Sequence, residues 1–362
     1  MRQRIARAGL MLAGFVIAAG CAMQTAPAAR IAAAGAIDLS IRHRFEVSAN
    51  TGKARNVILF VGDGMGVATV TAARIFDGQS RGEPGEENVL SFERLPHLAL
   101  IKTYNTNQQV SDSAGTATAM LTGIKTRAGV IAVGPEPRRR DCPGARGQEL
   151  TTIVDLAERR GLATGIVTTT RITHATPASA YAHSSERDFE NDAYMSDAER
   201  GLCTDIARQL LAYDEGDGLD VVFGGGYGEF VGADHGGKRR DPAANLIDGW
   251  LAGAANRRFV RRADELGALQ PGQQVLGLFA NSHLEYVVRR PPDTAEPTLR
   301  QMTLRALELL SARDGGYFLL VEGGRIDHGH HIGRAGFALT EAQAFAETVA
   351  AVLDRVDLDD TL

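Results

Sequence analysis

The chain has 362 residues, which is enough to bury a large core, and 44% of them are hydrophobic and 23% charged. This composition is globular and excludes a disordered chain or a protein that spans a membrane repeatedly. The formal net charge of −5 provides no broad basic surface, so nucleic acid is not an expected partner.

The first residues have the features of an export signal. Three arginines within the first seven positions precede the apolar run AGLMLAGFVIAAG, which is too short to span a bilayer. The segment AAGC ending at Cys21 resembles the lipobox of bacterial lipoproteins, although Ala18 stands where Leu is usual. Lipidation of Cys21 and ordinary signal cleavage further on both remain open. We predict a signal peptide over 1–21, a linker over 22–37, and export to the periplasm, either free or as a membrane-anchored lipoprotein.

Two cysteines remain if Cys21 belongs to the signal. Cys142 and Cys203 can pair in an oxidising compartment. Such a bridge would close a long loop and contribute about 4 kcal/mol on the chain-entropy estimate. Two unpaired thiols are the alternative.

Apolar, β-branched runs alternate with helical patterns along the rest of the chain. Strands are predicted at 56–61, 98–104, 164–170, 219–225, 274–279 and 317–322. Helices are predicted near 66–76, 114–123, 150–160, 202–213, 243–252, 298–311 and 334–354. This alternation is typical of an α/β fold with a mostly parallel central sheet and helices on both faces. No internal repeat and no second-domain boundary is visible.

Metal-ligating and hydrogen-bonding side chains follow three of the predicted strands. They are Asp63 after the first strand, His174 and Thr176 after the third, and Glu322, Asp327 and His331 at the end of the last. Ligands of parallel α/β sheets bind outside the carboxyl ends of the strands. We therefore expect these side chains to gather in one site.

The types of these side chains favour divalent cations. Asp63, Thr176 and Glu322 supply hard oxygens, which suit Mg²⁺. Asp327 and His331 are four residues apart, which places them on one face of a helical turn, and a mixed oxygen and nitrogen pair suits Zn²⁺. On the same geometry the neighbouring histidines of "IDHGHH" point elsewhere. A solvated surface loop is the alternative for this stretch.

Ser113 stands at the predicted start of a helix in "SDSAGTATAMLTG". A serine in this position usually caps the helix. The alternative is a nucleophile whose alkoxide is stabilised by amide donors, the helix dipole and a nearby cation. Because G-x-S-x-G is absent and no Ser/His/Asp triad can be assigned, a metal would have to activate Ser113. Arg187 is either solvated or a bidentate clamp on phosphate oxygens.

Taken together, these segments resemble alkaline phosphatases, more closely the animal-type branch than the shorter bacterial pattern. The resemblance rests on NVILFVGDGMGVATVTAARI, DSAGTATAMLTGIKT, VTTTRITHATPASAYAHSSERD and FLLVEGGRIDHGHHIGRA. It implies a catalytic domain over 38–362 that hydrolyses small phosphate monoesters through a phosphoserine intermediate, with broad specificity and an alkaline optimum. A homodimer is implied as well.

The resemblance also implies roles for individual residues. Ser113 would be the phosphorylated nucleophile, Arg187 would bind the phosphate, and Asp112 would orient Arg187. Cys142 and Cys203 fall where the animal-type branch has a disulfide.

Two Zn²⁺ ions and one Mg²⁺ ion are the implied cofactors. Their ligands in this chain would be Asp63, Thr176 and Glu322 for Mg²⁺, Asp327 and His331 for one Zn²⁺, and Asp63 and Ser113 for the other. His174 would lie just outside the Mg²⁺ ligands.

The chain also departs from the family pattern. The family continues past "DDTL" into a further strand and further zinc ligands, so the resemblance implies that the C-terminal strands are missing after Leu362. Ala280 stands where a glutamate of a calcium-type site is expected. Two alternatives follow: a non-catalytic metal- or phosphate-binding fragment, and a phosphodiesterase of the same superfamily.

Overall fold

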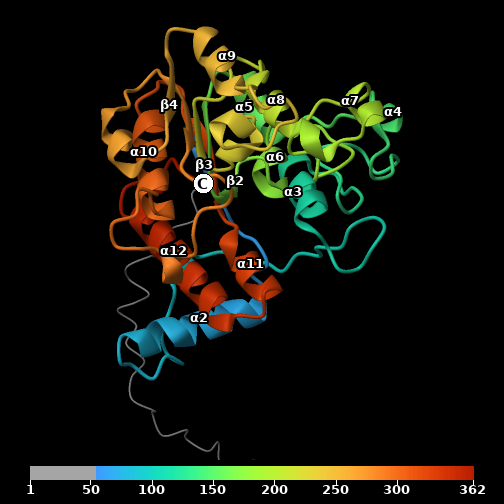
Figure 1. Cartoon of the computed structure of the whole chain (residues 1–362). Coiled ribbons are helices and arrows are strands. Elements are labelled where there is room, and N and C mark those ends of the chain that lie inside the picture. Colours follow the sequence, from blue (N-terminus) through green and yellow to red (C-terminus); the bar gives the residue numbers. More distant parts are fainter. Residues whose placement is uncertain (1–53) are drawn as a thin grey trace, which may run out of the picture. The chain divides into compact units, whose positions relative to one another are not determined.

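The computed structural model describes residues 54–362 (Figure 1). The predicted signal peptide, Cys21 and the linker lie outside these residues. Within 54–362, no helix is both long and apolar enough to cross a bilayer.

Six strands form one parallel sheet in the order β1-β6-β2-β3-β5-β4. They are β1 (Val57–Gly62), β2 (Ala163–Arg171), β3 (Val221–Gly225), β4 (Arg257–Val260), β5 (Gln274–Leu278) and β6 (Tyr317–Gly323). The predicted α/β fold with a parallel central sheet is confirmed.

Helices connect the strands. They are α2 (Val67–Ser80), α3 (Ser113–Thr122), α4 (Cys142–Ala145), α5 (Ile153–Glu158), α6 (Ala175–Ala178), α7 (Asp197–Arg200), α8 (Ile206–Leu211), α9 (Leu246–Ala252), α10 (Leu299–Ser311), α11 (Arg325–His331) and α12 (Ala335–Leu353). Short 3₁₀ turns occupy Ser91–Arg94, Asp192–Tyr194, Tyr227–Glu229, Ala233–His235, Ala263–Ala268 and Val287–Arg289.

The two faces of the sheet bury separate cores. Helices α10 and α12 cover one face, and α3, α5 and α8 cover the other (Figure 1). Val167 and Leu319 belong to the core on the first face, whereas Ile166 and Leu320 belong to the core on the second. Successive side chains of a strand alternate between faces, and both faces are apolar here. This explains why these strands appear in the sequence as continuous apolar runs.

Helix α10 illustrates how local sequence sets an element's bounds. The Thr298 hydroxyl accepts the Gln301 N–H at 3.1 Å, and the Gln301 side chain accepts the Thr298 N–H at 2.8 Å. This reciprocal cap begins the helix. Buried positions at Leu299, Met302, Ala306 and Leu310 then follow the helical period and face the sheet.

The predicted strand at 98–104 is wrong. These residues form no sheet ladder, and Leu98, Leu100 and Ile101 are 93%, 85% and 74% exposed. The Lys125 ammonium donates to the carbonyl oxygens of Lys102 and Tyr104 instead. The apolar pattern of a buried strand is present, but residues 54–362 place no partner strand beside it, and a strand forms only by pairing.

Strand β4 was not predicted. Its four residues begin with Arg257 and Arg258, and it pairs on one side only, with β5. Charged residues are common on edge strands because they discourage pairing with other chains. Because β4 begins with two arginines, it contains no apolar run, and the apolar pattern did not predict it.

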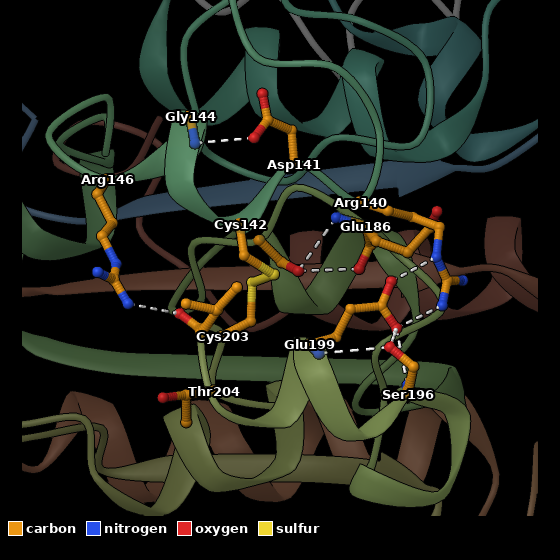
Figure 2. The surroundings of a disulfide bond; sticks show 12 residues. Arg140, Asp141, Cys142, Gly144, Arg146, Glu186, Ser196, Glu199, Cys203 and Thr204 are labelled. Atoms are coloured by element: carbon orange, nitrogen blue, oxygen red, sulfur yellow. Dashed lines mark hydrogen bonds and ion pairs between the residues drawn. A yellow bond between two sulfur atoms is a disulfide. The ribbon is translucent and has the colours of Figure 1, made fainter.

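The predicted disulfide between Cys142 and Cys203 is confirmed (Figure 2). Beside it, Arg140 pairs with Glu199 through two contacts of 2.7 and 2.8 Å. The Arg140 N–H donates to the carbonyl oxygen of Ser185 at 3.0 Å. The crosslinked loops therefore buttress the segment that leads to Arg187.

Removal of the bridge should destabilise the fold. We expect the double variant Cys142→Ser/Cys203→Ser to lose about 4 kcal/mol of unfolding free energy, because the bridge closes a loop with a sequence separation of 61. Urea unfolding followed by circular dichroism measures this loss. A reductant should lower the wild-type midpoint to that of the variant and leave the variant unchanged. An equal midpoint for oxidised and reduced wild type would contradict the prediction.

Candidate active site

The candidate site lies at the carboxyl ends of three adjacent strands. Strand β6 stands between β1 and β2, and its Glu322 is in register with Val61 on one side and Thr168 on the other. By strand alternation, Asp63, Glu322 and Thr168 all belong to the face covered by α3. Pairing and alternation together bring two carboxylates to one corner of the sheet.

Glu322 is fully buried. One of its oxygens, Oε2, accepts hydrogen bonds from the hydroxyls of Thr168 and Thr170. The Thr176 hydroxyl on α6 also donates a hydrogen bond to this carboxylate. Burial, and then the charge of Asp63, raise the pKa of Glu322 to about 7. The other oxygen, Oε1, has no hydrogen-bond partner within residues 54–362. An unpartnered buried carboxylate oxygen beside a second carboxylate favours a cation.

Asp63 follows β1 directly and contacts the start of α3. The Ser113 hydroxyl donates to Asp63 Oδ2 at 2.7 Å. Burial, and then the charge of Asp327, raise the pKa of Asp63 to about 6. Ser113 is the first helical residue, and the preceding Asp112 caps α3 by accepting the Gly115 N–H at 3.0 Å. The cap is therefore Asp112, which leaves the Ser113 hydroxyl directed at Asp63.

Asp112 also holds Arg187. Its Oδ2 accepts hydrogen bonds from Nη1 of Arg187 at 3.1 Å and from the Gly129 N–H at 2.8 Å. On the other side of the guanidinium, Nη2 contacts Nε2 of His174 at 3.0 Å. The Arg187 N–H donates to the Gly129 carbonyl oxygen at 2.8 Å. Main chain and side chain therefore both fix this arginine beside Asp63 and Ser113.

The helix α11 brings Asp327 and His331 to the same corner. His331 Nε2 lies 3.3 Å from Asp327 Oδ2, and the imidazole is 76% exposed. Asp327 packs against Gly64, where a Cβ would stand 2.7 Å from Asp327 Oδ1. Gly64 also has φ +66°, a conformation that favours glycine. The turn after β1 thus needs glycine both for its backbone and for the approach of Asp327.

Three imidazoles from separate segments meet beside Arg187. The ring centroids of His174 and His328 are 5.3 Å apart, and those of His328 and His283 are 4.4 Å apart. His328 therefore lies next to the site, while the exposed His330 contacts the Thr69 hydroxyl. Sequence spacing gave no signal for His283, because it comes from the loop after β5.

The donor set suits metal binding in part. Within 54–362, no three side chains of His, Cys, Asp or Glu are arranged to hold a metal ion. The Mg²⁺ set predicted from sequence has two carboxylates and the Thr176 hydroxyl, and its oxygens match the preference of that ion. The Zn²⁺ pair of Asp327 and His331 offers two ligands, where a zinc site has three or four.

The fold and these side chains define a parallel α/β protein with a candidate cation and phosphate site. Residues 54–362 match the alkaline phosphatase family. The alkaline phosphatase of Gadus morhua is 44% identical over 309 residues, and the tissue-nonspecific isozyme of Gallus gallus is 45% identical over 311 residues. The chain belongs to the alkaline phosphatase family, as the sequence predicted.

Solved structures agree. Thermus thermophilus alkaline phosphatase superposes with a TM-score of 0.69 and 32% identity, over 86% of this chain and 59% of that one. A TAB5 alkaline phosphatase mutant with Mg bound in the M3 site gives a TM-score of 0.64 at 25% identity, over 83% of this chain and 73% of that one. The matches with the Gadus and Gallus proteins cover 81% of this chain but only 64% and 59% of those relatives.

The buried carboxylates should make the metal-free protein sensitive to pH. A folded-state pKa raised from 4.5 to about 7 means that Glu322 favours folding below pH 4.5, and that this contribution is lost as the pH rises through about 7. Asp63, raised from 3.8 to about 6, acts in the same direction. The unfolding free energy of metal-free protein should therefore fall between about pH 4 and pH 7.

Mg²⁺ should restore part of this loss, and urea unfolding across the pH range measures it. Glu322→Gln should remove the Mg²⁺-sensitive part of the slope. Glu341 on α12 provides a matched control, because burial raises its pKa to about 7 as well, and its carboxylate accepts the Val287 N–H on the other face of the sheet. Glu341→Gln should also reduce the slope of the unfolding free energy against pH, but it should leave the effect of Mg²⁺ unchanged. Equal Mg²⁺ responses in both variants would contradict the assignment of Glu322.

Proposed function

We propose that this protein hydrolyses small phosphate monoesters through a phosphoserine intermediate on Ser113. The observation that carries the proposal is the 2.7 Å hydrogen bond from Ser113 to Asp63, with Arg187 held beside it by Asp112. A hydroxyl, carboxylates suited to cations and a guanidinium are the groups that phosphoryl transfer requires.

Ser113 and Arg187 have separate roles in this reaction. The Ser113 hydroxyl gives up its proton and its oxygen forms a bond to phosphorus, while the bond to the leaving-group oxygen breaks and that oxygen takes up a proton. Water then attacks the phosphoserine, which releases phosphate and regenerates Ser113. Arg187 offers two parallel N–H donors to the equatorial oxygens, on which charge accumulates. Because these contacts address the phosphoryl group rather than the leaving group, broad specificity follows.

We propose one Mg²⁺ and two Zn²⁺ as cofactors. Asp63, Thr176 and Glu322 would bind the Mg²⁺. Bound divalent ions would lower the pKa of the Ser113 hydroxyl and stabilise the attacking and leaving oxygens, which fits an alkaline optimum. The unpartnered Oε1 of Glu322 and the Mg bound in the TAB5 relative support the Mg²⁺ site. Asp327 and His331 support one Zn²⁺, and Asp63 and Ser113 the other.

Export, as a periplasmic protein or a lipoprotein anchored through Cys21, is also proposed. A disulfide between Cys142 and Cys203 supports an oxidising compartment. A homodimer is proposed from family membership alone.

Ser113→Ala should abolish hydrolysis of 4-nitrophenyl phosphate at alkaline pH, because no other group on the chain is proposed to form the covalent intermediate. Ser111→Ala, two residues earlier and outside the proposed machinery, should retain wild-type turnover. Mass spectrometry after acid quenching should find phosphate on Ser113 in the wild type only. Turnover by Ser113→Ala at the wild-type rate would remove Ser113 from its role.

Arg187 should determine the preference for monoesters. A monoester has three non-bridging equatorial oxygens, two of which can bind the guanidinium, whereas the second substituent of a diester occupies one of these positions. We expect Arg187→Ala to lose about 10- to 100-fold in kcat/KM for 4-nitrophenyl phosphate and much less for bis(4-nitrophenyl) phosphate. Arg187→Lys should recover charge but not bidentate binding. Faster diester than monoester hydrolysis by the wild type would instead favour a phosphodiesterase.

A further inference from the structure

We propose that His283 is a positioning residue for phosphate binding, which acts by holding the His174 ring against Arg187. The inference rests on the proposed function, since it concerns the phosphate that Arg187 binds. It assigns a task to a residue outside the set identified from sequence.

The main chain around His283 is anchored to the ends of two strands. The Leu284 N–H donates to the Thr169 carbonyl oxygen of β2 at 3.1 Å, and the Gly226 N–H after β3 donates to the Ser282 carbonyl oxygen at 2.7 Å. A Cβ on Gly225 would stand 2.0 Å from that same Ser282 oxygen, so the loop packs directly on the strand. His283 is therefore carried by a fixed segment.

The His283 ring is held from one side by Arg171, the last residue of β2. Nδ1 accepts the Arg171 N–H at 3.1 Å. The Arg171 guanidinium pairs with Glu190 through Nε at 2.7 Å and Nη2 at 2.5 Å. Arg171 is thus itself fixed by a buried carboxylate and presents the imidazole of His283 in one orientation.

On its other side, His283 faces two imidazoles. Its centroid lies 4.4 Å from that of His328 and 5.4 Å from that of His174. His174 meets both rings edge to face, each at an interplanar angle of 81°. Aromatic rings commonly pack edge to face in this way.

Within residues 54–362, one hydrogen bond and two ring contacts hold the His174 side chain. Nε2 contacts Arg187 at 3.0 Å, but Nδ1 is buried and has no hydrogen-bond partner within residues 54–362. A histidine beside a functional group usually has its second nitrogen fixed by a hydrogen bond. Here the neighbouring rings of His283 and His328 take that task. Loss of the His283 ring would free His174 to rotate and would leave one side of Arg187 without its contact.

Two substitutions separate the ring contact from the hydrogen bond to Arg171. His283→Phe keeps an aromatic ring beside His174 but has no acceptor. His283→Asn keeps an acceptor near the Arg171 N–H but has no ring. His183→Ala is the matched control, because this half-buried histidine bonds the Leu150 carbonyl oxygen away from the site.

The experiment measures inhibition of 4-nitrophenyl phosphate hydrolysis by inorganic phosphate, with the metal-loaded full chain. We expect His283→Asn to raise the inhibition constant of phosphate about tenfold, with a smaller change in kcat. His283→Phe should stay close to the wild type, and so should His183→Ala. Melting temperatures of all variants, measured in parallel, show that each is folded at the assay temperature.

A double-mutant cycle tests the route through His174. In a His174→Ala background, His283→Asn should cause no further loss of phosphate affinity, because the ring that it positions is absent. Additive losses, or a loss in His283→Phe that equals or exceeds that in His283→Asn, would overturn the inference and assign His283 to support of Arg171. An active wild type with unchanged phosphate inhibition in His283→Asn would overturn it as well. A wild type without phosphatase activity would instead contradict the proposed function on which the inference rests.

Discussion

The parallel pairing of β1 and β2 on the two sides of β6 is the constraint on which the candidate site depends. Val61, Glu322 and Thr168 stand in one row across the three strands. A shift of one residue in β6 would turn Glu322 toward the face of α10 and α12 and remove it from Asp63. The apolar side chains of β6 resist such a shift, because both faces of this strand are buried. Packing of the core therefore positions the carboxylate.

The site differs from two buried ion pairs of the protein in how its charge is balanced. Arg239 and Asp205 are both buried and pair at 2.8 Å, and Arg171 is paired with Glu190, so these charges are neutralised within the chain. Asp63 and Glu322 repel each other, and their pKa values are raised as a result of burial and of neighbouring carboxylates. Buried like charges are costly unless a cation joins them. Ser113 and Arg187 lie at the same corner as these two carboxylates.

The supports of Arg187 illustrate how distant parts of the chain serve one side chain. Asp112 caps α3 and bonds the guanidinium, so the same carboxylate starts a helix and orients the arginine. The disulfide-bonded loops brace the main chain before Arg187, and His174 contacts its outer nitrogen. These supports come from separate segments of the chain. Their convergence is what gives the arginine one position.

The sequence by itself determined the fold class, the ends of five of the six strands to within a few residues, the pairing partner of each remaining cysteine and the family. It did so because buried parallel strands, helix caps and strand-end carboxylates leave local patterns that survive without knowledge of contacts. Only the tertiary structure decided that 98–104 stays unpaired, that the charged edge strand β4 exists, and that His283 joins His174 and His328. These outcomes depend on which segments become neighbours in space. Strand pairing and ring packing are interactions between distant residues, so no local pattern specifies them.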